Sequence, residues 1–177
     1  MNKKFPSLKG ENFMLRQING SDIDNIYLGL SNPEIIKYYG VSYQSKSETE
    51  EQMKWFNELE QTETGIWWAV VNEKNDVFYG AIGLNNLNKI HRKAEIGFWL
   101  IPNFWGKGIM SGALKLIINY AFSGLNLHRI EAMVEKENLN SKKLLQKLNF
   151  SFEGTLVDHE IKNDSSISID VYAKLSQ

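Results

Sequence analysis

The chain has 177 residues and a formal net charge of −1, with 42% hydrophobic, 12% aromatic and 23% charged residues. These values predict one globular domain over residues 1–177 and leave little room for extended disorder. No basic block is present, so we expect no nucleic-acid partner, and the lack of cysteine excludes disulfides and thiolate nucleophiles. The longest apolar run, residues 66–71, is too short to cross a bilayer, and residues 1–10 lack a signal-type apolar segment. We therefore expect no membrane partner and a cytoplasmic location.

Hydrophobic periodicity predicts a single set of alternating strands and helices without long linkers or repeats. Strands are expected at residues 13–18, 66–72, 77–87, 94–101, 127–138, 152–161 and 166–175. Helices are expected at residues 21–30, 45–61, 109–122 and 141–150, with a short one inside 31–40. The strand–helix–strand connection from 94 to 134 must be a parallel crossover, whereas the hairpins are antiparallel. The pattern predicts a mixed α/β fold.

A loop with two glycines separates the strand at 94–101 from the helix that begins at residue 109. Gly106 and Gly108 at a helix entry let a phosphate approach unpaired backbone N–H groups at the positive end of the helix dipole. A GxG pair is also typical of an ordinary turn, and neither a GxGxxG fingerprint nor a P-loop is present. We interpret residues 106–110 as a pyrophosphate-binding loop.

The sequence WGKGIM at 105–110 resembles the acetyl-CoA-binding motif Q/R-x-x-G-x-G/A of GCN5-related N-acetyltransferases (GNAT). It is most similar to the branch of the ribosomal-protein N-terminal acetyltransferases that act on alanine or serine. Trp105 stands at the Q/R position, Gly108 at the central glycine, and Met110 where glycine or alanine is usual.

A second signature of the same superfamily, N-x-x-S/A followed by L-x-x-x-G-F, lies after the crossover. Asn138 and Ser141 occupy its first positions and Phe150 its last. Asn149 replaces the glycine, an exchange that a left-handed residue at a helix end tolerates. The resemblance extends from about residue 78 to the end of the chain.

The resemblance implies a GNAT fold with a twisted, mostly antiparallel sheet, flanking helices and acetyl-CoA as the co-substrate. The implied pantetheine site is the strand backbone around residues 98–100, where an N–H would polarise the thioester carbonyl. Asn138 has the alternative role of a helix N-cap, and both roles are compatible. The predicted acetyl-CoA-binding residues are Phe98, Trp99, Leu100, Trp105, Gly106, Lys107, Gly108, Ile109, Met110 and Asn138.

The candidate catalytic residues are Glu95 and Glu131 as bases and Ser141 as the group that protonates the leaving thiolate. A carboxylate buried beside aromatic residues has a raised pKa, although solvated strand-end glutamates are the common alternative. A dedicated base is also less necessary for an α-amino group, which titrates at about 7.7–8.0. The tyrosine that protonates the thiolate in some relatives is replaced by Leu145. Ser141 is the nearest hydroxyl in the motif, with helix packing or capping as its alternative role.

We predict an N-acetyltransferase that transfers acetyl directly to an amine, with a protein N-terminus as the first acceptor. A small amine such as an aminoglycoside or a polyamine stays open, because the acid-rich residues 47–63 offer an acidic cleft. A non-catalytic acyl-CoA sensor is the alternative from another class. The three histidines share no ligand spacing, so no metal is expected. The sequence leaves the oligomeric state open, and a homodimer is one option.

Overall fold

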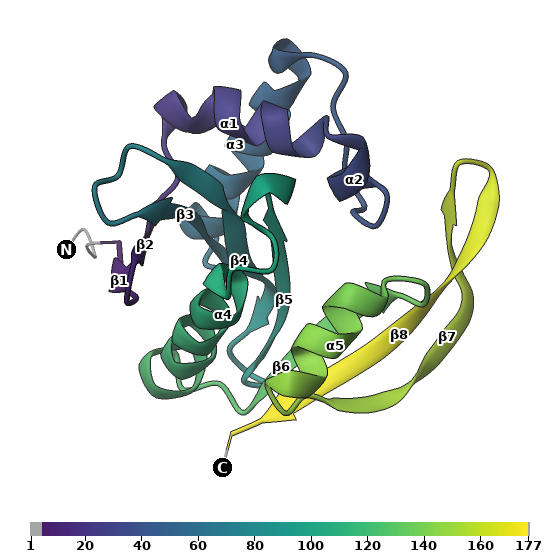
Figure 1. Ribbon diagram of the computed structural model, residues 1–177. Helices are drawn as coiled ribbons and strands as arrows, with labels where there is room; N and C mark the ends of the chain where they lie inside the picture. The colour runs from purple at the N-terminus through teal and green to yellow at the C-terminus, as the bar shows by residue number, and fades with distance from the viewer. Residues whose placement is uncertain (1–4, 177) are drawn as a thin grey trace.

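The computed structural model describes residues 5–176 and contains one eight-stranded sheet in the order β1-β2-β3-β4-β5-β6-β8-β7 (Figure 1). The strands are β1 Leu8–Lys9, β2 Phe13–Gln17, β3 Ile66–Asn72, β4 Phe78–Asn88, β5 Lys93–Leu100, β6 Arg129–Glu135, β7 Ser151–Lys162 and β8 Ser165–Leu175. The α-helices are α1 Ile23–Leu30, α2 Pro33–Ile36, α3 Lys46–Gln61, α4 Ile109–Asn119 and α5 Leu139–Lys147.

The neighbouring strands are antiparallel except for β5 and β6, which confirms the predicted crossover and the mixed, mostly antiparallel sheet. The parallel ladder contains three residue pairs and ends at Glu95 and Glu131. In the described part of the chain, β5 then continues to Leu100 without a partner on β6. The sheet therefore opens between these two strands.

The two faces of the sheet carry separate cores, because side chains alternate along each strand. On one face, Ala94, Ile96 and Leu100 of β5 pack with α4. On the other face, Trp99 packs with α1 and with Phe78 of β4. Figure 1 shows α1, α2 and α3 together above the sheet, and α4 on the other side. The opening between β5 and β6 thus lies in the layer between the two cores.

The two helices beside this opening differ from the sequence prediction, α5 at its start and α4 at its end. The side-chain oxygen of Asn138 accepts a hydrogen bond from the Ser141 N–H at 3.1 Å, so α5 begins at Leu139 rather than at residue 141. α4 begins at Ile109, as predicted, but its regular part ends at Asn119 and a π-helical turn covers Tyr120–Gly124. Asn138 and Ser141 thus share the first turn of α5.

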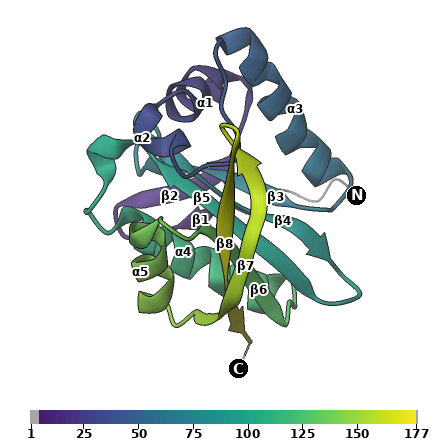
Figure 2. The ribbon, with the colours of Figure 1, turned by 90° about the vertical axis from the view of Figure 1, so that its right-hand side faces the viewer.

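The β7–β8 hairpin extends beyond the rest of the sheet, and its tip points towards α2 (Figures 1 and 2). The register of β7 against β8 shifts between Phe152 and Gly154 and again between Leu156 and Glu160. Such bulges increase strand twist and turn side chains towards new directions. Within residues 5–176, no helix is long and apolar enough to cross a membrane.

Candidate active site

Two cavities meet where β5 and β6 separate. The aromatic cavity, of about 560 Å³, lies beside Trp55, Trp67 and Glu95. The loop cavity, of about 810 Å³, lies beside residues 104–111. The residues common to both linings are Tyr38, Tyr39, Phe98, Asn138 and Ser141. The two cavities are therefore adjacent and share part of their lining.

The loop cavity brings together nearly all the residues predicted to bind acetyl-CoA. Those in its lining are Phe98, Trp99, Leu100, Trp105, Gly106, Gly108, Ile109, Met110 and Asn138. Lys107 is the exception, and its ammonium lies 5.5 Å from the centre of the Phe104 ring. The indole N–H of Trp105 donates to the Leu100 carbonyl at 2.8 Å and so ties the loop to the end of β5.

The glycines of the loop have the geometry that a phosphate site requires. Gly106 and Gly108 have φ angles of +72° and +79°, and an added Cβ at either position would meet no atom within 4 Å. Gly108 is the N-cap of α4 and contributes no side chain, so the cap leaves N–H groups of the first turn open to a ligand. The open space and the helix N-terminus fit a pyrophosphate.

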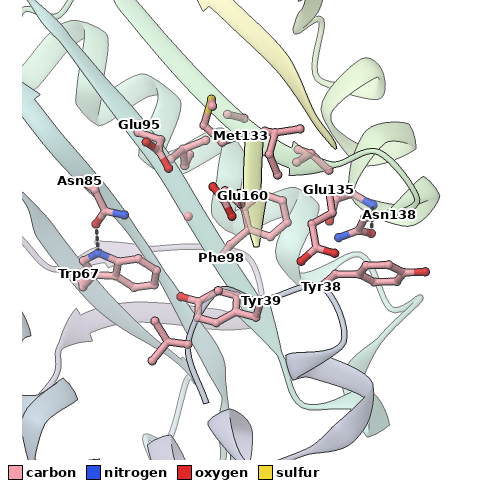
Figure 3. A pocket seen from close by; sticks show the side chains of 18 of the residues that line it. Tyr38, Tyr39, Trp67, Asn85, Glu95, Phe98, Met133, Glu135, Asn138 and Glu160 are labelled. Atoms are coloured by element: carbon pink, nitrogen blue, oxygen red, sulfur yellow. Dashed lines mark hydrogen bonds between the residues drawn. The ribbon is translucent and has the colours of Figure 1, made fainter. Parts of the chain in front are cut away.

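A fixed indole forms one wall of the aromatic cavity (Figure 3). The Trp67 N–H donates to the Asn85 side-chain oxygen at 2.6 Å. A Cβ at Gly83 would lie 2.3 Å from the indole and one at Gly97 would lie 3.0 Å from it, so both glycines are needed for this packing. Trp55 packs against Trp67 with ring centroids 5.8 Å apart. The face of a held indole attracts cations.

The charged residues that line the aromatic cavity are all acidic: Glu51, Glu95, Glu135 and Glu160. The described lining includes no lysine, arginine or histidine. Figure 3 shows Glu95, Glu135 and Glu160 around Phe98, with Tyr39 opposite Glu95. The cavity therefore has a negative potential that favours a cationic ligand.

Glu95 is the predicted base that the structure places in this cavity. Burial raises its pKa above the usual range, a hydrogen bond from Asn86 opposes the rise, and the charges of Glu131 and Glu160 add to it. A carboxylate with a raised pKa is a better proton acceptor near neutral pH. Its position and electrostatics suit a general base.

Glu131 lies outside the linings of both cavities. Its carboxylate accepts hydrogen bonds from Arg129 at 2.8 Å and from Lys93 at 3.1 Å. Although burial opposes the effect, these partners hold its pKa below the usual range. The sequence predicts Glu95 and Glu131 equally as candidate bases, whereas in the structure only Glu95 lines the aromatic cavity.

Ser141 is the predicted catalytic residue that lies where the two cavities join, because it lines both. Its backbone N–H, rather than its hydroxyl, forms the capping bond to Asn138. Leu145, at the position of the tyrosine in some relatives, is fully buried in the core on the α4 side.

Several cavity residues were missed by the sequence reasoning: Tyr38, Tyr39, Trp67, Asn85 and Glu160. Burial, with smaller contributions from Tyr43 and Glu95, raises the pKa of Tyr39 and keeps its phenol protonated. These residues belong to no motif and meet only in the folded chain. The available signal was the acid-rich segment at 47–63, which contributes only Glu51 to the acids of this cavity.

A metal site is not apparent in the described region, since no group of three or more histidine, aspartate or glutamate residues there has a suitable arrangement.

A family model described as an acetyltransferase (GNAT) domain matches residues 12–151. The chain belongs to the GNAT acetyltransferase family. As a GNAT enzyme it is an N-acetyltransferase, and CoA or acetyl-CoA is the co-substrate of its structural neighbours.

Several GNAT relatives match most of the chain. An uncharacterized N-acetyltransferase, YoaA, from Bacillus subtilis is 34% identical over 170 residues, which cover 96% of each chain. A spermidine N-acetyltransferase from Vibrio cholerae, solved with CoA and spermine, has a TM-score of 0.82 and 27% identity over 93% of this chain and 95% of its own. A ribosomal L7/L12 α-N-protein acetyltransferase in complex with coenzyme A has a TM-score of 0.86 over 96% of this chain and 98% of its own, and its 21% identity shows the fold alone.

Proposed function

We propose that this GNAT enzyme transfers acetyl directly from acetyl-CoA, held in the loop cavity, to an amine held in the aromatic cavity. The main support is the junction of the two cavities at Phe98, Asn138 and Ser141. Direct transfer requires both substrates to be bound together, and the chain has no cysteine to form an acyl intermediate.

The residues of the loop cavity hold the co-substrate. Backbone N–H groups at Gly106–Met110 bind the pyrophosphate at the start of α4. The edge of β5 from Phe98 to Leu100, which has no partner on β6, binds the pantetheine arm, and an N–H of this edge stabilises the oxyanion of the thioester carbonyl.

Two side chains move the protons of the reaction. Glu95 accepts the proton that a substrate ammonium must lose before its nitrogen can attack, or that the amine loses after attack, either directly or through one water molecule. Ser141, at the junction, donates a hydrogen bond to the departing thiolate. The amine nitrogen adds to the thioester carbonyl to give the oxyanion, and the carbon–sulfur bond then breaks. The departing thiolate takes up a proton, so the products are the acetylated amine and CoA.

The first candidate acceptor is the N-terminal amine of a protein. Its support is the similarity of the motifs to those of the ribosomal-protein branch. An α-amino group is also easier to deprotonate, since its pKa is about 7.7–8.0 against about 10.4 for a lysine-type amine.

A polyamine is the second candidate acceptor, and a specific observation favours it. The four glutamates and the indole of Trp67 form a lining suited to a cationic chain.

The cytoplasmic location and the homodimer stay predictions.

A thiol-release assay with acetyl-CoA against N-terminal peptides and small amines tests the proposal. We expect CoA release only with an amine present, and initial-rate plots at several acceptor concentrations should intersect. Parallel lines with a competent acetyl-enzyme would exclude direct transfer. Tight acetyl-CoA binding with no acceptor-dependent release would favour the sensor alternative.

A further inference from the structure

Lys162, at the end of β7, joins three separate elements beside the aromatic cavity. Its ammonium donates to Glu135 Oε1 at 2.5 Å and to the Lys37 carbonyl at 2.7 Å. Glu135 ends β6, and Lys37 directly follows α2. One side chain of the hairpin thus connects the end of β6 with the segment that follows α2.

The contact is not an ordinary surface pair. The side chains of Lys162 and Glu135 are 22% and 14% exposed. A largely desolvated ammonium must be paired. Here the Glu135 carboxylate and the Lys37 carbonyl at the end of α2 both accept hydrogen bonds from it. The two acceptors form a binding position for one ammonium, which the chain itself fills.

The ammonium of Lys162 reduces the negative charge at the Glu135 end of the aromatic cavity. Glu135 lines this cavity, whereas its partner Lys162 is not part of the lining. Glu51 and Glu160 are exposed, so water screens their charges more strongly. Of the carboxylates away from Glu95, Glu135 is therefore the one with which a second substrate ammonium would interact most strongly.

We propose that Lys162 is a specificity-determining residue whose ammonium neutralises Glu135, so that the cavity accepts one cationic amine near Glu95 and disfavours a diamine. The inference rests on the proposed function, because it assumes that the aromatic cavity binds the acceptor. It favours an acceptor with a single amine at this end, such as a protein N-terminus, over a polyamine.

Two amines of equal chain length, pentylamine and 1,5-diaminopentane, provide the test. Their dissociation constants are measured by calorimetry on the enzyme–CoA complex, and their kcat/KM values by thiol release. Lys162→Met should raise the selectivity for the diamine over the monoamine by about tenfold or more, because Glu135 is freed for the second ammonium. Lys162→Arg keeps the charge and should leave the selectivity within about twofold of the wild-type value.

An unchanged selectivity in folded Lys162→Met would overturn the inference and leave Lys162 as a fastening of the hairpin alone. If Lys162→Met does not fold, Glu135→Gln decides, since it leaves a positive charge at this end and should lower the diamine selectivity. A higher selectivity for the diamine in Glu135→Gln would contradict the proposal. So would a failure of both amines to bind to the wild type. Amines that bind with the expected selectivity but are not acetylated would refute the proposed function and not this inference.

Discussion

Replacement of Gly108 by valine tests the assignment of the pyrophosphate loop. The φ angle of +79° places this residue in the left-handed region, which costs an L-residue roughly 1–2 kcal/mol. A Cβ would meet no atom within 4 Å, so no steric clash adds to this cost in the free protein. We expect the free energy of unfolding to fall by about 2 kcal/mol. For a chain of this size that corresponds to a melting temperature about 4–8 °C lower.

The effect on the ligand should be separate from the effect on stability. A valine side chain would occupy the open space above the loop and displace the phosphate from at least one backbone N–H. The loss of one hydrogen bond to a charged group corresponds to a dissociation constant for CoA about 10- to 100-fold higher. Calorimetry with CoA measures this change, and differential scanning fluorimetry measures the melting temperature.

Asn149→Val is the matched control, because Asn149 also has a left-handed backbone, with a φ of +60°, and lies outside the lining of both cavities. It should lower the melting temperature with little change in CoA affinity. Wild-type affinity in folded Gly108→Val, or an equal loss of affinity in both variants, would refute the assignment.

Three further substitutions test the remaining roles. Glu95→Gln should lower kcat/KM by about 10²-fold or more. Because the pKa of Glu95 is raised, the fall of kcat/KM at acidic pH that Glu95 causes should occur above the usual glutamate range. This fall should disappear in Glu95→Gln. An unchanged pH profile of kcat/KM with the same acceptor would contradict a base role. Ser141→Ala should lower kcat at least about tenfold at a nearly unchanged melting temperature, whereas early melting with normal turnover would leave Ser141 a structural role only. Asp170→Asn should reduce the free energy of unfolding at pH 7 by about 3 kcal/mol, because Asp170 is 5% exposed and accepts from Lys142 at 2.5 Å and Thr155 at 2.6 Å. Although burial opposes the effect, these two hydrogen bonds lower the pKa of Asp170. The stabilisation that ionised Asp170 provides is therefore present above the usual aspartate range and is lost as the pH falls through the lowered pKa. Equal stability of the variant and the wild type at pH 7 would contradict this prediction.

Local sequence was sufficient to predict the loop cavity. Gly106, Gly108 and the start of α4 are adjacent in the chain, and glycine spacing at a helix entry has a direct structural meaning. The parallel crossover followed from the strand–helix–strand order in the same way. In this part of the molecule, neighbours in sequence are neighbours in space.

The aromatic cavity was not predictable in this way. Tyr39, Trp67 and Glu160 lie on three distant segments, and only the folded sheet and hairpin bring them together. The register shift between Leu156 and Glu160 alters the alternation of β7, so the sequence pattern does not show which side chains face the cavity.

The two candidate bases illustrate a second limit. Glu95 and Glu131 are paired in the parallel ladder, and the alternation of side chains alone does not show which of them faces the cavity. The ion pairs of Glu131 with Lys93 and Arg129 decide between them, and such side-chain contacts are not encoded in the hydrophobic pattern.

The most direct test of acetyl transfer to an amine in the aromatic cavity is a thiol-release assay of the wild type beside Glu95→Gln, with acetyl-CoA and a panel of peptides and amines. The account predicts amine-dependent CoA release with an acetylated amine seen by mass spectrometry, and a strong loss of rate in the variant although acetyl-CoA still binds. Acetyl-CoA binding without acetylation of any amine, or equal rates for the wild type and Glu95→Gln, would contradict it.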